Sequence, residues 1–463
     1  MLTLTNGGRP RKNERHLARR SAIKVGTLGA FGFSLADLMS LKASQPSQKS
    51  KLNDKSVILI WLDGGPTQFE TYDPKPDAPS EYRGPWGDIK TNVPGMRFSE
   101  MLPLQAKHAD KMAVIRSVHH STGDHFAGAH WMLTGKFGST SANKAQKSPS
   151  VGSCVAKLTG ERVKGIPPYI GLPAAESVYL YPGYQGAAYL GASYNPFQLN
   201  MKQKYLASNY KAAIKPPPFL GGMDDSVAKR LTERDQLLQN IDGINRRMDQ
   251  SGLMEAMDTH QQSAIEMMLS SNSREAFDIE KESDATRDRY GRGPWGHYTL
   301  MARRLVENGS RFVTVDMPHW DTHSKIKSAM ETRLPVYDQA VAALLQDLEE
   351  RSLMDDVLVV IMGEFGRTPK LNSGQPGIPI PGRDHWGNSM SVVMAGGGLN
   401  CGQIVGATNA KGEHPVERAL APSDVLATIY HVLGIDLNTM LHDYSGRPIP
   451  ILDSGKPIRE LVS

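Results

Sequence analysis

The chain has 463 residues, of which 39% are hydrophobic and 22% charged, a composition that is typical of a globular protein and argues against a largely disordered one. Its formal net charge is +5, but residues 1–43 contain eight Lys or Arg and only two acidic residues, which leaves 45 of the 53 basic and 46 of the 48 acidic residues for the rest. The basic excess is therefore confined to the N-terminus, and no nucleic-acid partner is expected. Cys154 and Cys401 are the only cysteines, which excludes a metal cluster held by thiolates.

Residues 1–45 have the organisation of an export signal followed by a linker. A basic, polar stretch leads to Arg19 and Arg20, and the weakly apolar segment 25–41 follows them, interrupted by Asp37. This pattern resembles a twin-arginine signal, which is read by an export machinery that carries folded proteins. The segment is shorter than the roughly 20 apolar residues that a spanning helix needs, so no stable membrane span is expected after cleavage. We therefore expect export to the periplasm or cell envelope.

Residues 52–463 show the alternation of strands and helices that is typical of an α/β domain, with a sheet covered on both faces by helices. The continuous apolar run at 57–62 predicts a strand that is buried on both faces. The polar, helix-forming composition within about 177–290 predicts a helical insertion on the domain surface, and 151–220 is expected to be irregular with short strands. Further strands are predicted at 112–118, 311–316, 357–362 and 391–395, and helices at 125–135, 296–308, 334–348 and 423–433.

Asp63 directly follows the first predicted strand and precedes Gly64 and Gly65. Open α/β sheets bind ligands at the carboxyl ends of their strands, and two glycines allow a tight turn and a close approach to the backbone. A carboxylate at this place is a suitable metal ligand. A simple turn that favours Asp-Gly explains the same residues, so this stretch alone leaves both interpretations open.

Four histidines lie within twelve residues directly after the strand at 112–118, whereas the whole chain holds 14. This density predicts that at least one of them belongs to an active site, because imidazole acts as an acid, a base or a metal ligand near neutral pH. Local capping or packing accounts for the others. The four are His119, His120, His125 and His130.

Polar side chains also follow two later strands. Asp321 and His323 come shortly after the strand at 311–316, Glu364 follows the strand at 357–362, and His385 lies in the next loop. We expect these loops to meet at the sheet edge that also carries Asp63. Carboxylate oxygen and imidazole nitrogen without sulfur suit a divalent metal such as Zn²⁺, Mn²⁺ or Ca²⁺.

Two arginines accompany these residues in the same loops. Arg367 follows Glu364, and Arg383 precedes His385. A guanidinium group binds anionic oxygens well, so the arginines are candidate anchors for a negatively charged group. Together the residues predict a metal site that handles an anionic oxygen ester.

Five motifs follow one another along the chain: WLDGGPTQFETYDPKPDAP, HFAGAHWMLTG, WDTH, GEFGRTP and GRDHWG. In this order, behind a twin-arginine signal, they resemble the exported sulfatase-like proteins of the domain-of-unknown-function 1501 family, within the alkaline phosphatase-like superfamily. The resemblance covers Ser56 to Leu433 and implies an alkaline phosphatase or sulfatase-like fold. It also implies the metal ligands Asp63, Asp321, His323, Glu364 and His385.

The chain departs from the sulfatase pattern at the nucleophile. His125 stands where sulfatases carry the Cys or Ser that becomes formylglycine, and Ala129 stands where they carry an arginine. A formylglycine mechanism is therefore excluded. His125 is a nucleophile, an acid/base group or a metal ligand, or else Thr67 or Ser121 supplies a hydroxyl, or the protein only binds its ligand.

The sequence favours a metal-dependent hydrolase of phosphate or sulfate esters in the cell envelope, acting on an anionic small molecule or glycan ester. His125 and Arg367 are its candidate catalytic residues, the arginine stabilising the charge that develops during reaction. The alternative is a catalytically inactive, metal-containing envelope protein that binds sulfated or phosphorylated glycans.

Overall fold

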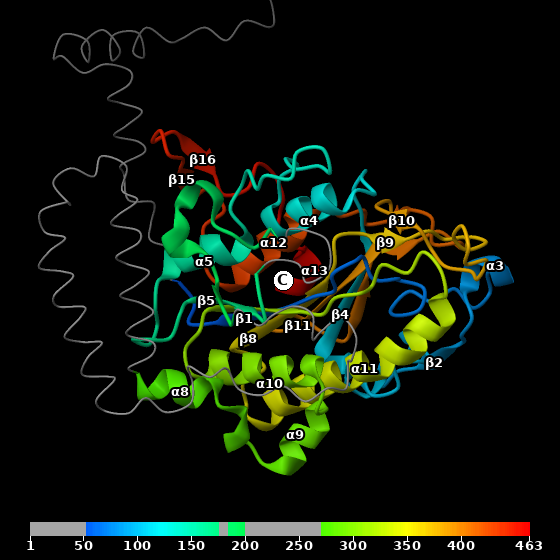
Figure 1. Cartoon of the computed structure of the whole chain (residues 1–463), viewed down its shortest axis with the longest axis horizontal. Coiled ribbons are helices and arrows are strands. Elements are labelled where there is room, and N and C mark those ends of the chain that lie inside the picture. Colours follow the sequence, from blue (N-terminus) through cyan, green and yellow to red (C-terminus); the bar gives the residue numbers. More distant parts are fainter. Residues whose placement is uncertain (1–51, 176–183, 200–269) are drawn as a thin grey trace, which may run out of the picture. The chain divides into compact units, whose positions relative to one another are not determined.

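The computed structural model describes residues 52–175, 184–199 and 270–463 (Figure 1). The predicted export signal at 1–45 and most of the predicted insertion lie outside these ranges. Of the insertion, the described part includes a strand that joins the main sheet and, at 270–290, two short helices. No helix among the described residues has the length and apolar character needed to cross a membrane.

An eight-stranded sheet forms the centre of the domain, in the order β12-β4-β11-β8-β1-β7-β5-β6. Strand β11 is antiparallel to both of its neighbours, and the other pairs are parallel. The strands are β1 (Ser56–Trp61), β4 (Met112–Val118), β5 (Tyr169–Leu172), β6 (Phe197–Gln198), β7 (Phe312–Asp316), β8 (Val357–Met362), β11 (Met390–Gly396) and β12 (Gln403–Val405).

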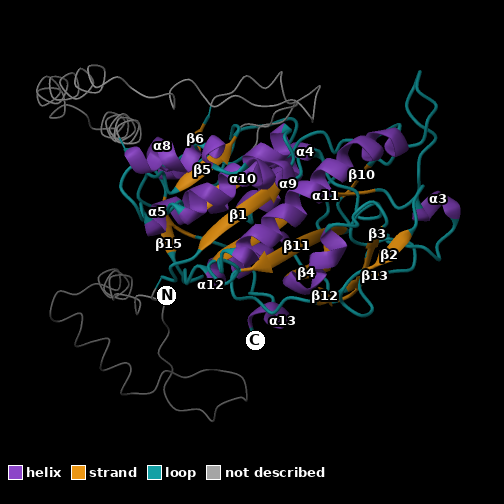
Figure 2. Ribbon diagram, turned by 90° about the horizontal axis from the view of Figure 1, so that it is seen from below, coloured by secondary structure: helices purple, strands orange, loops and turns teal. Residues whose placement is uncertain are grey.

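Helices cover both faces of this sheet (Figure 2). All six residues of β1 are buried, and successive side chains enter different cores because a strand alternates its faces. Ile58 and Ile60 pack in the core that includes α10 (Pro294–Glu307) and α11 (Ile326–Glu350). Val57 and Leu59 pack in the other core, with α4 (His125–Thr134), α5 (Val151–Thr159) and α12 (Pro422–Val432). The predicted fold class, a sheet covered on both faces by helices, is confirmed.

Two helices differ from the sequence prediction. The predicted helix at 334–348 begins earlier, at Ile326, and continues past Pro335. Ile326, Met330 and Leu334 are buried at four-residue spacing, so burial of this apolar stripe extends the helix despite the proline. Helix α5 forms within a region predicted to be irregular, where the Ser150 side chain accepts a hydrogen bond from the Ser153 amide.

Both cysteines are free thiols, Cys154 buried on α5 and Cys401 half-buried.

Short helices and two-stranded sheets complete the described chain. The remaining helices are α3 (Ser80–Arg83), α8 (Ser271–Phe277), α9 (Asp284–Tyr290) and α13 (Arg459–Val462). The small sheets pair β2 (Asp88–Lys90) with β3 (Arg97–Ser99), β9 (Gly366–Arg367) with β10 (His385–Trp386), β13 (Ala407–Thr408) with β14 (Pro415–Glu417), and β15 (Met440–His442) with β16 (Pro448–Pro450).

The topology brings five loops to one edge of the sheet. Strands β1, β7, β8 and β4 run in the same direction and therefore end at the same edge, whereas β11 runs the opposite way and begins there. The segments after Trp61, Val118, Asp316 and Met362 and the segment before Met390 therefore converge. These segments carry the polar residues that the sequence singled out.

Candidate metal centre

Gly64 allows the loop after β7 to lie directly against the turn after β1. Its φ is +112°, and a Cβ at this position would lie 2.6 Å from the Asp321 backbone nitrogen and 2.9 Å from that of Trp320. The Trp320 amide also donates to the Asp63 carbonyl at 3.0 Å. Glycine is therefore required here because only hydrogen fits between the two backbones. This contact positions Asp321 at the sheet edge.

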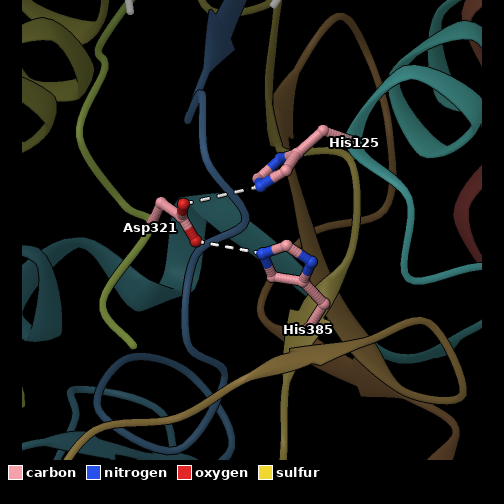
Figure 3. Close-up of side chains that lie close together, drawn as sticks. All are labelled: His125, Asp321 and His385. Carbon is pink, nitrogen blue, oxygen red and sulfur yellow. Dashed lines mark hydrogen bonds and ion pairs between the residues drawn. The ribbon is translucent and has the colours of Figure 1, made fainter. Parts of the chain in front are cut away.

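Three imidazoles surround the Asp321 carboxylate, each through its Nε2 atom. The Nε2 atoms of His323 and His385 lie 2.9 and 3.0 Å from Asp321 Oδ1, and that of His125 lies 3.6 Å from Oδ2. Figure 3 shows His125 and His385 pointing at the carboxylate from different parts of the chain. Among the described residues, the donor atoms of His125, Asp321 and His385 form a group within 4.8 Å that is suited to hold a metal ion. The Nε2 atoms of His323 and His385 are 2.9 Å apart.

The other nitrogen of each ring, Nδ1, is held by an oxygen acceptor. Carboxylates and carbonyls accept hydrogen bonds, so these contacts place a proton on each Nδ1. A neutral imidazole protonated on Nδ1 has only a lone pair on Nε2. The pairs are His125 with Glu364 Oε1 at 2.7 Å, His323 with Asp384 Oδ1 at 2.6 Å, and His385 with the Gly123 carbonyl at 2.7 Å.

These anchors turn the centre into a cluster of acceptors. The Nε2 atoms of His323 and His385 lie 2.9 Å apart and within 3.0 Å of Asp321 Oδ1, and that of His125 lies 3.6 Å from Oδ2. Lone pairs that face one another at such distances repel unless a proton or a cation lies between them. Either protons or a metal ion can supply this positive charge. Imidazole nitrogens with their second nitrogen bound to a carboxylate or carbonyl are the usual form of histidine ligands in metal sites.

The electrostatics of the metal-free centre follow from the same contacts. Burial lowers the pKa of His125, but Asp321 and Glu364 outweigh it and raise that pKa to about 9. The pKa of His323 is raised, chiefly by its hydrogen bond to Asp321, whereas burial lowers the pKa of His385. Burial opposes ionisation of Asp321, yet the three imidazoles hold the pKa of this carboxyl well below its usual range. Without metal, protons therefore stabilise the cluster.

The two predicted arginine anchors lie buried in protein contacts. Arg367 donates to Asp321 Oδ1 at 2.7 Å, to the Gly65 carbonyl at 2.8 Å, and also to the Gly64 carbonyl. Arg383 pairs with Glu70 at 2.9 Å, and both guanidinium side chains have 0% exposure. Through these contacts Arg367 orients Asp321. The predicted role of Arg367 as an anchor for a negatively charged substrate group stays a prediction.

Glu364 contacts this centre, and Asp63 lies in the adjoining turn after β1. Glu364 Oε1 accepts both from His125 and from the Gly64 amide, the latter at 2.9 Å, while its Oε2 is buried without a hydrogen-bond partner among the described residues. Asp63 is buried at the end of β1, where its amide donates to the Met317 carbonyl at 3.2 Å. Of the five predicted ligands, Asp321, His323 and His385 come together, and Glu364 contacts them through His125.

One protein-family model matches nearly the whole chain. Residues 54–462 match the model described as "Protein of unknown function (DUF1501)". The chain belongs to the DUF1501 family. The resemblance noted from the five motifs is thereby confirmed at the level of the family. Comparison of this DUF1501 protein with curated proteins gives no match.

Three bacterial proteins are among the solved structures with a similar fold. A lipoteichoic acid synthase from Listeria monocytogenes is 10% identical, with a TM-score of 0.38 over 88% of this chain and 77% of that one. A sulfatase from Pseudoalteromonas sp. is 12% identical, with a TM-score of 0.36 over 90% and 72%. An alkaline phosphatase from the Antarctic bacterium TAB5 is 12% identical, with a TM-score of 0.31 over 76% and 95%. At these scores no activity follows for the DUF1501 protein.

Sequence reasoning missed one residue of the centre. Asp384, which holds His323, precedes His385 directly in GRDHWG. Its position beside a proposed ligand was the available signal, but nothing in the sequence pairs it with His323.

The remaining histidine and hydroxyl candidates make other contacts than those of the metal centre. Nε2 of His120 contacts the Glu364 carbonyl at 2.6 Å, and Nδ1 of His130 contacts the Lys136 carbonyl at 2.7 Å, so both rings are bound to backbone. The Thr67 hydroxyl is buried and donates to Glu70, whereas Ser121 is exposed.

Proposed function

We propose that this DUF1501 protein is a metal-dependent hydrolase of phosphate or sulfate esters. The observation that carries the proposal is the convergence of three Nε2 atoms on Asp321, with the Nδ1 atom of each ring bound to an oxygen acceptor. His125, Asp321, His323 and His385 would hold the ion. A bound divalent metal supplies Lewis-acid stabilisation of anionic oxygen and lowers the pKa of bound water.

The donor set favours a transition metal. Three imidazoles and one carboxylate suit Zn²⁺ or Mn²⁺, whereas Ca²⁺ prefers six to eight oxygen ligands. Of the three metals expected from the sequence, we therefore propose Zn²⁺ or Mn²⁺. The choice of His125 as a ligand rests on its Nδ1 contact with Glu364, which leaves Nε2 directed at Asp321.

The residues around the ion assist an attack by water on the ester. Hydrolysis forms a new bond from water oxygen to phosphorus or sulfur, breaks the bond to the alcohol oxygen, and leaves a proton on the departing alcohol. Arg367 keeps the Asp321 carboxylate in place through its contacts with the β1 turn, and Glu364 keeps His125 oriented. Precise placement of such groups is a large part of enzymatic rate enhancement.

We further propose that the protein works in the periplasm or cell envelope. The support is the twin-arginine pattern at Arg19 and Arg20, which would bring the folded chain to the export machinery. Its substrate would be an anionic small molecule or a glycan ester. The resemblance of the five motifs to sulfatase-like proteins supports this substrate class.

The test begins with metal analysis of the purified protein. We expect about one equivalent of Zn²⁺ or Mn²⁺ in wild type, strongly reduced in Asp321→Asn and in His385→Ala. A chelator should lower the melting temperature of wild type toward those of the variants, because a ligand bound only by the native state stabilises it. His431→Ala, on α12, is a matched histidine control that should keep its metal. If wild type carries no metal after incubation with either ion, the proposal is wrong.

A substrate screen then separates enzyme from binding protein. Aryl and alkyl phosphates, phosphodiesters and sulfates are assayed with each metal, using Asp321→Asn as the inactive control. Turnover that depends on metal and is lost in the variant supports the hydrolase. If the protein binds metal and sulfated or phosphorylated glycans but hydrolyses no ester, the inactive binding protein is the correct function.

A further inference from the structure

The three Nδ1 anchors of the metal centre differ in kind. His385 is anchored by a backbone carbonyl, that of Gly123, and His125 by Glu364, whose side chain is 1% exposed. The anchor of His323 is Asp384, whose side chain is 51% exposed. His323 is therefore the ring whose orientation depends on a side chain at the protein surface, and some other contact has to keep that side chain in place.

Asn372 provides this contact. Its Nδ2 donates to Asp384 Oδ2 at 3.1 Å and to the His323 carbonyl at 3.0 Å, so one amide group joins the histidine to its anchor. Its Oδ1 accepts from the amides of Gly374 and Gly382, at 2.9 and 2.8 Å. The Asn372 side chain thus makes all four of its possible hydrogen bonds, two as donor and two as acceptor, within the loops that carry the centre.

The backbone around Asp384 is held as well. Its amide donates to Thr368 Oγ1 at 3.0 Å, and its carbonyl accepts from the Thr368 amide at 2.9 Å. Gly382 lies so close to the His323 segment that a Cβ would meet the His323 carbonyl carbon at 2.2 Å. Asp384 therefore reaches His323 from a backbone that is fixed on both sides, in spite of its exposed side chain.

We infer that Asp384, held by Asn372, is a positioning residue that fixes the Nδ1-protonated form of His323 and directs its Nε2 lone pair into the metal centre. The inference rests on the proposed metal-dependent function. Because Asp384 Oδ1 accepts a hydrogen bond from the protonated Nδ1, Nε2 faces Asp321 and His385 as a lone pair. A residue that orients a metal-bound histidine in this way typically contributes 10 to 100-fold to metal affinity.

The first experiment measures metal affinity with the full-length chain. Competition with a chromophoric chelator gives the dissociation constants of Zn²⁺ and Co²⁺ for wild type, Asp384→Asn and Asn372→Ala. Asp384→Asn is expected to weaken binding about 10 to 100-fold, with a changed Co²⁺ absorption spectrum, and Asn372→Ala to weaken it less. Asp384→Glu, which keeps the negatively charged carboxylate, should recover part of the loss. The control is Asp453→Asn, which removes a 63% exposed carboxylate paired with Lys136 at 2.8 Å and should leave affinity unchanged.

The second experiment needs no metal. In ¹⁵N-histidine-labelled, chelator-treated protein, at a pH high enough to keep the His323 ring neutral despite its raised pKa, the ring-nitrogen shifts of His323, assigned by comparison with His323→Gln, report which nitrogen carries the proton. Asp384→Asn should shift them away from the Nδ1-protonated form, and Asp453→Asn should not. If both the shifts and the affinity are unchanged in Asp384→Asn, the inference is wrong. If wild type binds neither ion, the proposed function fails, while the shifts still decide whether Asp384 sets the tautomer.

Discussion

The carboxylate of Glu364 lies 2.7 Å from His125 Nδ1, and the opposite nitrogen of the same ring faces Asp321 at 3.6 Å. His125 is thus placed between two carboxylates, with its side chain 6% exposed. The pair of negative groups attracts either a proton or a metal ion to the ring. The competition between these two cations makes the behaviour of the centre depend on pH.

The stability of metal-free protein is expected to fall as the pH rises from 6.5 to 9. The pKa of His125 is raised in the folded protein from 6.5 to about 9 by Asp321 and Glu364, against the effect of burial. The stabilisation from its proton is therefore complete below pH 6.5 and is lost as the pH passes about 9. Thermal unfolding in chelator, across this range, should show a smaller decline for His125→Gln than for wild type. The exposed His414→Gln serves as the control, and parallel curves for wild type and His125→Gln would contradict the assignment.

Gly64→Ala should destabilise the protein far more than Gly446→Ala. Both glycines have positive φ, +112° and +78°, so each alanine carries a backbone penalty of about 1 kcal/mol or more. Only at Gly64 would the new Cβ also meet backbone atoms, at 2.6 Å from the Asp321 nitrogen, which adds about 1 to 3 kcal/mol. Urea unfolding measures the difference, and metal content should fall only in Gly64→Ala. Equal free energies of unfolding would show that the loop after β7 is not held by this contact.

Arg367→Lys tests whether this arginine orients Asp321. Lysine keeps the charge but cannot reach Asp321 and the carbonyls of Gly64 and Gly65 together, so we expect a loss of about 2 kcal/mol or more, with reduced metal affinity. Arg447→Lys, whose side chain is 73% exposed beside Asp443, should change the free energy of unfolding by about 0.5 kcal/mol or less. If Arg367→Lys instead loses only turnover, with stability and metal content intact, the arginine contacts substrate, as the sequence suggested.

Replacing both Arg19 and Arg20 by lysine should leave folded precursor in the cytoplasm. The arginine pair is read by the export receptor and does not act as a membrane anchor, so conservation of charge is not sufficient. Cell fractionation followed by detection of precursor and mature chain measures the effect, with Arg9→Lys plus Arg11→Lys as the control. Normal export of the double Arg19 and Arg20 variant would rule out the signal.

The sheet and the location of the centre could be predicted from local sequence. The run at β1 is apolar on both faces, and β4 and β8 occur within the predicted bounds. Periodicity and the length of apolar runs are properties of neighbouring residues, so the sequence displays them directly. Asp321, Glu364 and His385 could be singled out as candidates because the topology gathers polar groups at the ends of strands along one edge.

The role of each residue within the centre was decided only by the tertiary structure. The sequence could not show that Glu364 contacts His125, that Asp384 contacts His323, or that Arg367 turns inward to Asp321. These contacts join residues 46 to 239 positions apart, at distances of 2.6 to 2.7 Å. Such distances are set by how closely backbones approach at Gly64 and Gly382, where a single Cβ would separate the loops. Local patterns therefore determined which groups reach the sheet edge, and the packing of the loops decided which nitrogen and oxygen atoms face one another there.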